Sequence, residues 1–307
     1  MDDIALTILI VAYEPGERLL RTLESIVSQS RRPDILIQDG GSTDGSYERA
    51  AQYLRDAGYS VSSYIEGAPA PQVRSGGAGG TAILWQGRDD GIYDAMNRAL
   101  AHAADAYPAA GGGRYILFLG CGDRLSDTHV AEAVAQAIVR DRSGEKEPGP
   151  AIYYGDVLEK LTGQRVSSDP RLNDYSLYRN VPCHQACVYD AGLLYAEPFD
   201  TRYRVRADYE QFLRLVRRAG ARTVYTGLLI AEYEGGGFSE TSEHLRLSEQ
   251  EHRQIIHMYM SDRQIMRFDI YRALTLAPLR TRLARSPLTS GMYNRFKTII
   301  YKYLRKG

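Results

Sequence analysis

The stretch LTILIVA, residues Leu6–Ala12, decides the fold class. Such an apolar run is typical of a β-strand that is covered on both faces of a sheet. After a Pro-Gly break, apolar residues recur at helical spacing as far as Ser30. A second short strand, Ile35–Gln38, and a second helix through Leu54 follow. This strand, helix, strand, helix order predicts a parallel sheet wound with helices.

The same analysis of the remaining chain predicts an α/β architecture with a mostly parallel central sheet and helices on both faces. Further strands are predicted at Thr81–Trp85, Tyr115–Leu119, Ile152–Tyr154, Ala186–Tyr189 and Thr223–Ala231, and further helices at Tyr93–Ala104, Thr128–Arg140 and Tyr209–Arg218. Beyond about residue 240 the pattern is helical and increasingly basic. We therefore expect one catalytic domain over residues 1–240 and a basic, helical C-terminal extension over residues 241–307.

The net charge of zero hides an uneven distribution. The 307 residues include 38 Lys or Arg and 38 Asp or Glu, but residues 264–307 hold ten of the basic residues and only one acid. The tail therefore carries a charge of +9 and the rest of the chain −9. With 44% hydrophobic residues the composition excludes a disordered chain. Three cysteines, with no signal-peptide pattern and no long apolar run, predict reduced thiols in a cytoplasmic protein.

Acidic residues follow two of the predicted strands. Asp39 ends the second strand, and Asp123 comes shortly after Tyr115–Leu119, each among glycines that allow close approach to a ligand. In an open α/β sheet, ligands bind outside the carboxyl ends of the strands. The two common glycine-rich phosphate loops are absent from the sequence. We therefore expect a divalent cation, held by a carboxylate, to neutralise a bound diphosphate.

Several motifs in a fixed order resemble a known family. They are ILIVAY (8–13) with QDGGSTDG (38–45), GIYDAMN (91–97), YILFLGCGD (115–123), and HQ (184–185) with ADYEQFLRL (207–215). Together they resemble the family-2 glycosyltransferases of GT-A fold, and in particular bacterial polysaccharide glycosyltransferases of the colanic-acid type. The resemblance covers roughly residues 5–240.

The resemblance implies a nucleotide-sugar site, most simply for a UDP-sugar. Its residues would be Ala12, Tyr13, Glu14, Asp39, Asp94, Asn97, Gly122 and His184. For Asp39 the alternative is a turn acid or helix cap, and for Asp94 it is a cap or a solvent-exposed side chain. Asp44 is expected to organise its turn and cap the helix at Ser46.

The resemblance also implies that Asp123 holds Mn²⁺ or Mg²⁺. Where the family often carries Asp-x-Asp, this sequence has Cys121-Gly122-Asp123. A hard cation prefers oxygen to sulfur, so Cys121 is not expected to be a ligand. His184 is a candidate further ligand or diphosphate contact, and the alternative is a loop histidine whose hydrogen bonds are satisfied within the protein.

Asp208 is the candidate catalytic base, because a sugar hydroxyl needs a base within hydrogen-bond reach. A helix N-cap role for Asp208 is compatible with this one. Glu210 is the alternative base, and Asp156, at another strand end, is either an acceptor contact or a turn residue.

Two basic segments suggest partners. Arg202, Arg204 and Arg206 alternate before Asp208 and would either meet a diphosphate or form a solvated edge. On a helical wheel, residues 293–306 place aromatic and aliphatic side chains opposite Arg295, Lys302, Arg305 and Lys306, which predicts an amphipathic helix on an anionic membrane surface. Packing on the catalytic domain or on a second copy of the chain is the alternative. No nucleic-acid-binding motif accompanies the charge.

These expectations combine into one hypothesis. The chain would be an inverting, metal-dependent glycosyltransferase, peripheral on the cytoplasmic face of the membrane, with a polyprenyl-linked saccharide or growing surface glycan as acceptor. The loop GGGFS (235–239) would close over the donor. The alternative is a non-catalytic nucleotide-sugar sensor or scaffold with the same fold. The Cys-Gly-Asp motif, which has one acid fewer than Asp-x-Asp, is compatible with this alternative.

Overall fold

The computed structural model describes residues 4–67, 80–107, 113–144, 149–234 and 242–275. The chain divides into two compact units, Met1–Ile255 and Ile256–Gly307, and the boundary falls inside a helix, α8 (Ser242–Tyr259). The first unit contains every residue of the predicted site. The boundary expected after residue 240 stays a prediction.

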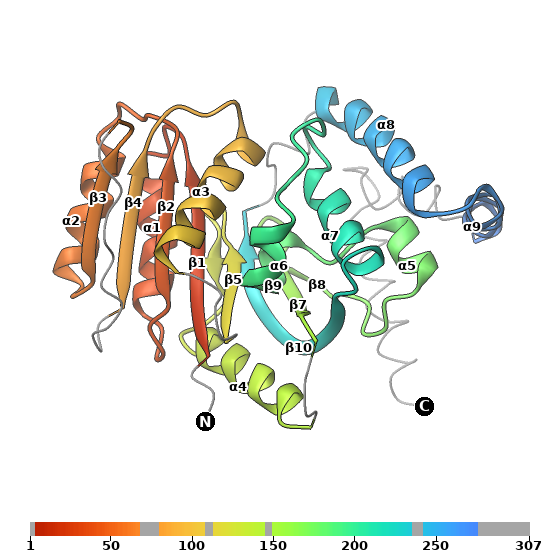
Figure 1. The fold of residues 1–307 in the computed structure, drawn as a ribbon, viewed down its shortest axis with the longest axis horizontal. Coiled ribbons are helices and arrows are strands. Elements are labelled where there is room, and N and C mark those ends of the chain that lie inside the picture. The colour runs from red at the N-terminus through yellow and green to blue at the C-terminus, as the bar shows by residue number, and fades with distance from the viewer. Residues whose placement is uncertain (1–3, 68–79, 108–112, 145–148, 235–241, 276–307) are drawn as a thin grey trace. The chain divides into compact units, whose positions relative to one another are not determined.

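The first unit is built on a ten-stranded sheet with the order β3-β4-β2-β1-β5-β9-β7-β10-β6, in which β8 pairs with β7 (Figure 1). The strands are β1 Ala5–Ala12, β2 Asp34–Asp39, β3 Ser60–Ile65, β4 Thr81–Gln86, β5 Arg114–Phe118, β6 Arg124–Leu125, β7 Ala151–Glu159, β8 Gln164–Val166, β9 Cys187–Asp190 and β10 Arg222–Tyr233. Strands β3, β4, β2, β1 and β5 are mutually parallel. Strand β9 is antiparallel to both of its neighbours, while β7 and β10 are parallel to each other.

Helices cover both faces of this sheet, as expected. They are α1 Glu17–Val27, α2 Ser46–Asp56, α3 Ile92–Ala106, α4 Val130–Arg142, α5 Asp174–Arg179, the short 3₁₀ helix η1 His184–Ala186, α6 Ala191–Ala196 and α7 Ala207–Arg217. Because side chains alternate along a strand, Ile8 and Ile10 of β1 pack in the core cluster with α1, α2 and α4. Leu9 is buried on the other face, where α3 packs against β1 and β2. The predicted α/β fold with a mostly parallel sheet is confirmed.

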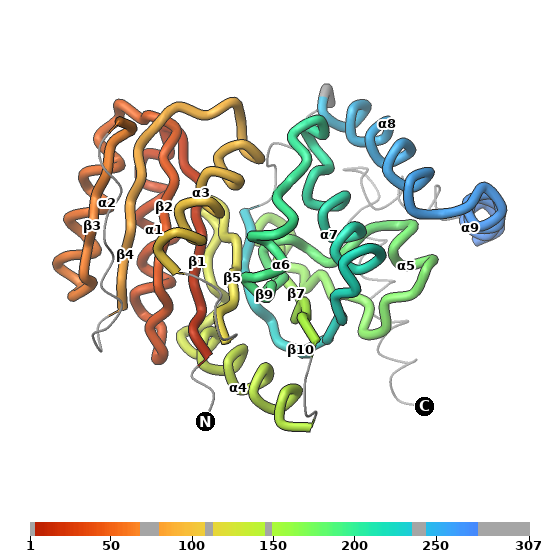
Figure 2. Tube along the Cα trace, in the orientation of Figure 1, coloured from red at the N-terminus to blue at the C-terminus, as the bar shows by residue number. Residues whose placement is uncertain are grey.

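The main strand that the sequence pattern missed is β3. Its residues SVSSYI are half-exposed or exposed in an alternating way, so they lack the apolar run that marked β1. Strand β3 lies at the edge of the sheet and pairs only with β4 among the described strands (Figure 2). An edge strand with one solvent-facing side needs few apolar residues, and periodicity alone does not distinguish such a segment from a loop.

The described part of the second unit is helical. It contains the end of α8 and α9, Asp262–Leu274, which begins with a capping box at Ser261 and Gln264. Exposed apolar residues recur on α9 at Met266, Ile270 and Leu274. No helix among the described residues is both long and apolar enough to cross a membrane. The predicted amphipathic helix over residues 293–306 lies outside the described residues.

Candidate functional site

The carboxyl ends of three neighbouring strands meet at one edge of the sheet. Ala12 of β1 is in register with Asp39 of β2, and Asp39 with Gln86 of β4. The segment that holds Asp123 leaves β5 at the same edge, because β5 is parallel to β1. The parallel order of the strands therefore brings together the acidic residues that the sequence places at separate strand ends.

Asp39 is the hub of the β2–α2 turn. Its side chain is only 1% exposed, and Oδ1 accepts hydrogen bonds from the backbone N–H groups of Gly41 (3.0 Å) and Ser42 (2.7 Å). Oδ2 accepts the Ser42 hydroxyl at 2.7 Å, and the Gln86 amide donates to Oδ1 at 3.2 Å. The carboxylate thus organises its own turn, as the turn alternative expected. Its contact with a nucleotide stays a prediction.

The loop after β1 has an open aromatic ring and a strained residue. Tyr13 is 70% exposed. Glu14 has a φ of +43°, the left-handed region that non-glycine residues rarely adopt. Its N–H donates to the Ser42 hydroxyl at 2.8 Å, and its carboxylate accepts both the N–H and the hydroxyl of Thr43. These bonds tie the β1 and β2 loops together and leave the face of Tyr13 free for a flat ligand.

Asp44 has the turn role expected from the sequence. Its Oδ2 accepts the N–H of Gly16 at 2.8 Å, and its Oδ1 accepts the N–H of Ser46, the first residue of α2, at 2.9 Å. The hydrogen bonds to Ser46 are the largest influence that lowers the pKa of Asp44. This prediction is confirmed, and the carboxylate also holds the start of α1 against that of α2.

The start of α3 adds one acid that sequence reasoning missed. Asp89 accepts the N–H of Gly91 at 3.0 Å, and burial raises the pKa of its carboxyl group. A Cβ atom on Gly40 would lie 2.7 Å from Asp89 Oδ2, so Gly40 permits this approach. The sequence contained a signal, because Asp89 lies just beyond β4 and close to a glycine, as Asp39 does beyond β2.

The two predicted residues on α3 differ in their surroundings. Asp94 accepts the Asp90 N–H at 3.1 Å and the Nε–H of Arg98 at 2.9 Å. The side-chain amide of Asn97 makes two hydrogen bonds with the backbone of Phe199. Nδ2 donates to the Phe199 carbonyl at 2.9 Å, and Oδ1 accepts the Phe199 N–H at 2.8 Å. Asn97 therefore fixes the loop that leads to α7. A contact of either residue with nucleotide stays a prediction.

Asp123 is buried at the β5 end of the site. Its carboxylate is 8% exposed and accepts the Gln185 amide on Oδ2 at 3.1 Å and the Glu234 N–H on Oδ1 at 3.3 Å. Burial is the largest influence that raises its pKa. Gln185 was not predicted as a site residue, although it lies beside His184 in the HQ motif.

Two arginines of α1 pair with Glu234, whose backbone N–H binds Asp123. Arg18 and Arg21 pair with the Glu234 carboxylate at 3.2 and 3.6 Å. Gly122 has a φ of +100°, and a Cβ atom there would lie 2.8 Å from Glu234 Oε2 and 2.9 Å from Arg18 Nε. No local sequence pattern marks this group, because its members come from α1, the loop after β5 and the segment that follows β10.

The donor set around Asp123 fits a cation that shares its ligands with a substrate. Burial raises the pKa of the Cys121 thiol to about 12, and whether Cys121 takes part in metal binding stays a prediction. No group of three or more His, Cys, Asp or Glu side chains suited to a metal occurs within the described residues. Asp123 thus offers a hard oxygen ligand to Mn²⁺ or Mg²⁺, and the remaining ligands would be diphosphate and water.

His184 lies among aromatic rings. Its ring is 4.8 Å from that of Phe118 and 5.8 Å from that of Phe199, measured between centroids. Burial lowers its pKa, so the ring is neutral. Nδ1 is 3.4 Å from the Tyr189 hydroxyl, and Nε2 is buried with no hydrogen-bond partner among the described residues. The buried Nε2 without a partner among the described residues does not match a loop histidine with all its hydrogen bonds satisfied, and a ligand role stays a prediction.

The short helix η1 is close to both Asp123 and Asp208. Gln185 binds Asp123, and the charge of Asp208 acts on the neighbouring His184. Burial raises the pKa of the Cys183 thiol to about 12, and the charges of Asp123 and Asp208 add to that rise. The segment that contains Cys183, His184 and Gln185 is therefore bonded to Asp123 and lies within electrostatic reach of Asp208.

Asp208 is held at the start of α7 with one oxygen free. The Tyr93 hydroxyl lies 3.0 Å from Asp208 Oδ1 and 3.0 Å from the carbonyl oxygen of Val205, and it donates its proton to either. Burial, and then the charge of Asp208, raise the pKa of Tyr93 well above its usual value, so Tyr93 remains a donor. Asp208 Oδ2 accepts no hydrogen bond from the described residues. The alternative base, Glu210, is buried and paired with Arg214 at 3.1 Å.

The other sequence candidates have structural partners. Asp156 is buried and accepts hydrogen bonds from Arg165 at 2.7 Å, from the Ser168 N–H and from Tyr225. Arg202 pairs with Asp200, and Arg206 binds Ser248 and Asn180. The segment around these arginines is not an extended strand, so the shared face expected from strand geometry is absent. The GGGFS loop lies outside the described residues.

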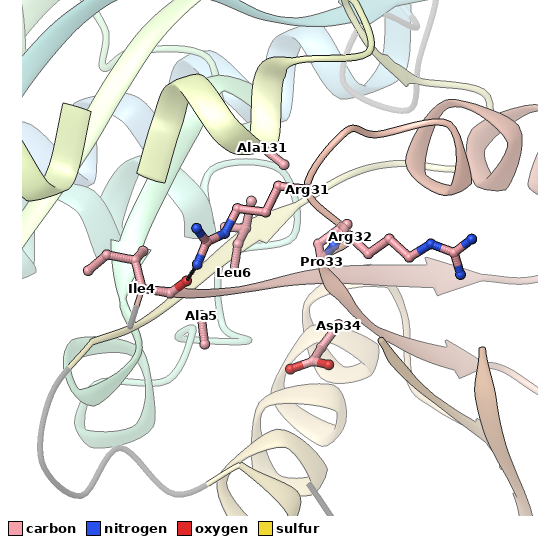
Figure 3. Close-up of a pocket in the computed structure, with 8 residues that line it drawn as sticks. All are labelled: Ile4, Ala5, Leu6, Arg31, Arg32, Pro33, Asp34 and Ala131. Carbon is pink, nitrogen blue, oxygen red and sulfur yellow. Dashed lines mark hydrogen bonds between the residues drawn. The ribbon is translucent and has the colours of Figure 1, made fainter. Parts of the chain in front are cut away.

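A small cavity of about 170 Å³ lies at the opposite edge of the sheet (Figure 3). It is lined by Ile4, Ala5, Leu6, Arg31, Arg32, Pro33, Asp34 and Ala131. The strand β1 begins at Ala5 and β2 at Asp34, so this cavity lies at the amino ends of the strands. It is therefore separate from the site formed by the strand ends at Asp39 and Asp123.

Comparison with known proteins agrees with this geometry. The sequence model of glycosyl transferase family 2 matches residues 7–143. The PGL/p-HBAD biosynthesis glycosyltransferases of Mycobacterium bovis and Mycobacterium tuberculosis are 31% identical over 222 residues, which are 71% of this chain and 73% of theirs. The chain therefore belongs to the family-2 glycosyltransferases, and the predicted family is confirmed. The colanic-acid type stays a prediction.

Solved structures show the same fold. Staphylococcus aureus TarS 1-349 in complex with UDP matches with a TM-score of 0.54 and 14% identity, over 83% of this chain and 70% of that chain. The mannosyltransferase PcManGT from Pyrobaculum calidifontis, in complex with GDP-Man and Mn²⁺, matches with a TM-score of 0.52 and 15% identity, over 98% of this chain and 82% of that chain. The chain spans 37% of the longer TarS chain. The predicted GT-A fold is confirmed.

Proposed function

We propose that this glycosyltransferase transfers a sugar from a nucleoside-diphosphate sugar to a hydroxyl group, with inversion at the anomeric carbon. The observation that carries the proposal is the free Oδ2 of Asp208, on a carboxylate whose other oxygen is held by Tyr93. Asp208 accepts the proton of the acceptor hydroxyl, which attacks the anomeric carbon from the face opposite the leaving diphosphate. A single displacement of this kind inverts the configuration.

The donor's nucleotide would lie between the β1 and β2 loops, with its base against the exposed ring of Tyr13. Its diphosphate would extend toward Asp123. A divalent cation, when bound there, neutralises charge on the leaving group. Asp123 would hold it, and Arg18 and Arg21 would add positive charge from α1. Their ion pairs with Glu234 are half-exposed and therefore weak, so a diphosphate would displace Glu234 at little cost.

A UDP-sugar is the proposed donor. UDP and UDP-GlcNAc are bound in TarS structures of the same fold, and GDP-Man in the structure of PcManGT. The proposed acceptor is a lipid-linked saccharide or growing surface glycan, which fits relatives that act in PGL/p-HBAD biosynthesis. The apolar stripe on α9 and the +9 tail support work at an anionic membrane surface.

The change Asp208→Asn tests the proposal. An amide cannot accept the acceptor's proton, so transfer should fall by about 10²- to 10⁴-fold. The measurement is UDP release from a panel of UDP-sugars in the presence of a lipid extract, with UDP binding followed by thermal shift. UDP binding should be unchanged, and Asp200→Asn, in the preceding loop, should keep full activity.

Full activity of the Asp208→Asn variant would overturn the assignment of the base. A wild-type chain that binds a UDP-sugar but neither transfers nor hydrolyses it would favour the alternative, a non-catalytic sensor. Retention of configuration in the product, measured by NMR, would exclude the single displacement.

A further inference from the structure

A buried glutamate on α8 binds the segment that carries the proposed base. Glu251 is 4% exposed. Its Oε1 accepts the backbone N–H of Arg204 at 2.8 Å, and its Oε2 accepts those of Val205 and Arg206 at 3.0 and 2.8 Å. A carboxylate that accepts three successive N–H groups forms strong, charge-assisted hydrogen bonds.

These three N–H groups depend on Glu251. Residues 201–206 belong to no helix or strand, so their backbone has no regular hydrogen-bond ladder, and buried N–H groups need a partner. Helix α7 also lacks a side-chain cap of its own. Glu251 lies at the N-terminus of this helix, where a negative charge is favourable. The backbone immediately before α7 is thus held by a side chain from a helix more than forty residues further along the chain.

The same segment is held from a second side. The Val205 carbonyl lies 3.0 Å from the Tyr93 hydroxyl of α3, which also reaches Asp208 Oδ1. Val205 is thereby fixed through its N–H by α8 and through its C=O by α3. Asp208 follows three residues later, in the first turn of α7. The position of its carboxylate is consequently determined by two separate helices.

Neighbouring residues on α8 strengthen this contact. Ser248, buried one helical turn before Glu251, accepts the Arg206 Nε–H at 2.7 Å. The Nε2 of His252 lies 2.9 Å from the Tyr178 carbonyl oxygen, and its ring lies 5.1 Å from that of Tyr209 on α7. Figure 1 shows α8 running past α7. The buried side chains of α8 thus include Ser248 and Glu251 beside the apolar Ile255 and Ile256, and charged or polar residues are seldom buried without a partner.

We propose that Glu251 is a positioning residue for catalysis, which holds the 204–206 backbone so that the Asp208 carboxylate faces the acceptor hydroxyl. The inference rests on the proposed role of Asp208. A displacement of a catalytic group by about 1 Å is enough to reduce a rate about 10²-fold. Donor binding is made by other elements, at β1, β2 and α1, and should not depend on Glu251.

The test is Glu251→Gln, which keeps the volume but replaces one acceptor oxygen by a donor that faces an N–H. We expect kcat to fall about 10- to 100-fold, with the KM for the donor and UDP binding unchanged. Amide hydrogen exchange, followed by mass spectrometry, should accelerate in residues 204–208. The control is Glu249→Gln, at an exposed residue of the same helix. It should change neither kcat nor the rate of hydrogen exchange in residues 204–208.

A second variant, Glu251→Asp, keeps the charge but shortens the side chain by one methylene, and should show the same loss in kcat. It serves as the test if the Gln variant does not fold. Unchanged kcat in the folded variants, or a rise in donor KM equal to the loss in kcat, would overturn the proposal. If Asp208→Asn is inactive while Glu251→Gln is fully active, Glu251 lacks this role and Asp208 remains the base. If Asp208→Asn is active, the proposed function itself is wrong.

Discussion

At the scale of single residues, the site depends on carboxylates whose surroundings assign them different tasks. Among the described residues, both side-chain oxygens of Asp39 are bonded within its own turn, the buried Asp123 side chain has two hydrogen-bond partners, and Asp208 Oδ2 accepts no hydrogen bond. The sequence marks all three in the same way, as acids near strand ends or helix starts. Their hydrogen-bond partners distinguish a structural acid from a candidate ligand and a candidate base.

The pairing of Asp123 with a substrate diphosphate makes a prediction about metal binding. Mn²⁺ and UDP together should raise the melting temperature by more than the sum of their separate effects, because each completes the other's site. Ligand at a hundred times its Kd stabilises by about 2.7 kcal/mol. In the Asp123→Asn variant, the rise in melting temperature that depends on Mn²⁺ should disappear, while the rise caused by UDP alone should remain. Differential scanning fluorimetry measures both.

The matched control is Asp105→Asn, an exposed acid on α3, which should behave as the wild type. A Mn²⁺ effect that survives Asp123→Asn undiminished would show that the cation binds elsewhere.

At the scale of elements, the strand ends were predictable and the ties between their loops were not. The run at β1 and the turn at Asp44 follow from local patterns: Asp44 accepts the N–H of Ser46, while the N-cap residue itself is Gly45, which has no side-chain cap. The Gly16 N–H to Asp44 bond joins residues 28 positions apart. Such a bond depends on the order of β1 and β2 in the sheet, which the local periodicity of the sequence does not encode.

The Asp44 bonds predict a pH-dependent contribution to stability. Because folding lowers the pKa of Asp44 below 3.8, the stabilisation is present above that value and is lost as pH falls through the folded-state pKa. Asp44→Ala should reduce the free energy of unfolding by about 1 kcal/mol at pH 7, as for other lost caps. Urea unfolding, followed by the fluorescence of Trp85, measures the difference.

Below pH 3.8 the difference in the free energy of unfolding between the wild type and Asp44→Ala should become smaller. Asp44→Asn keeps an acceptor oxygen, so its free energy of unfolding at pH 7 should lie between those of the wild type and Asp44→Ala. If the two free energies of unfolding differ by the same amount at pH 7 and at pH 3, the ionisation of the Asp44 carboxylate does not contribute to stability.

At the scale of the whole molecule, the charge separates along the chain. The 44 residues from 264 carry +9, while the residues before them carry −9 and include the acidic site. An acidic site repels a free nucleotide sugar, which is consistent with the proposed cation and with the positive charges of Arg18 and Arg21 at Glu234. The basic tail, in contrast, favours an anionic surface.

The tail makes a prediction about membranes. The triple change Lys302→Gln, Arg305→Gln and Lys306→Gln should weaken binding of the full chain to anionic phosphatidylglycerol vesicles by about 3 kcal/mol, at about 1 kcal/mol for each charge near the surface. This corresponds to about a 100-fold rise in Kd, measured by vesicle sedimentation.

The control removes three exposed arginines from the first unit, Arg55, Arg140 and Arg171, and should leave vesicle binding unchanged. Equal affinity of the wild type for neutral and anionic vesicles would contradict an electrostatic role for the tail.

The sequence by itself determined the α/β class, the family and the carboxylates at the strand ends, because apolar periodicity and short motifs are local properties. Only the tertiary structure revealed the partners of those carboxylates: Tyr93 and Glu251 around the base, and Gln185 and Glu234 around Asp123. These residues come from distant parts of the chain. Sheet order and helix packing bring them together, and a linear pattern does not record which distant side chains will meet.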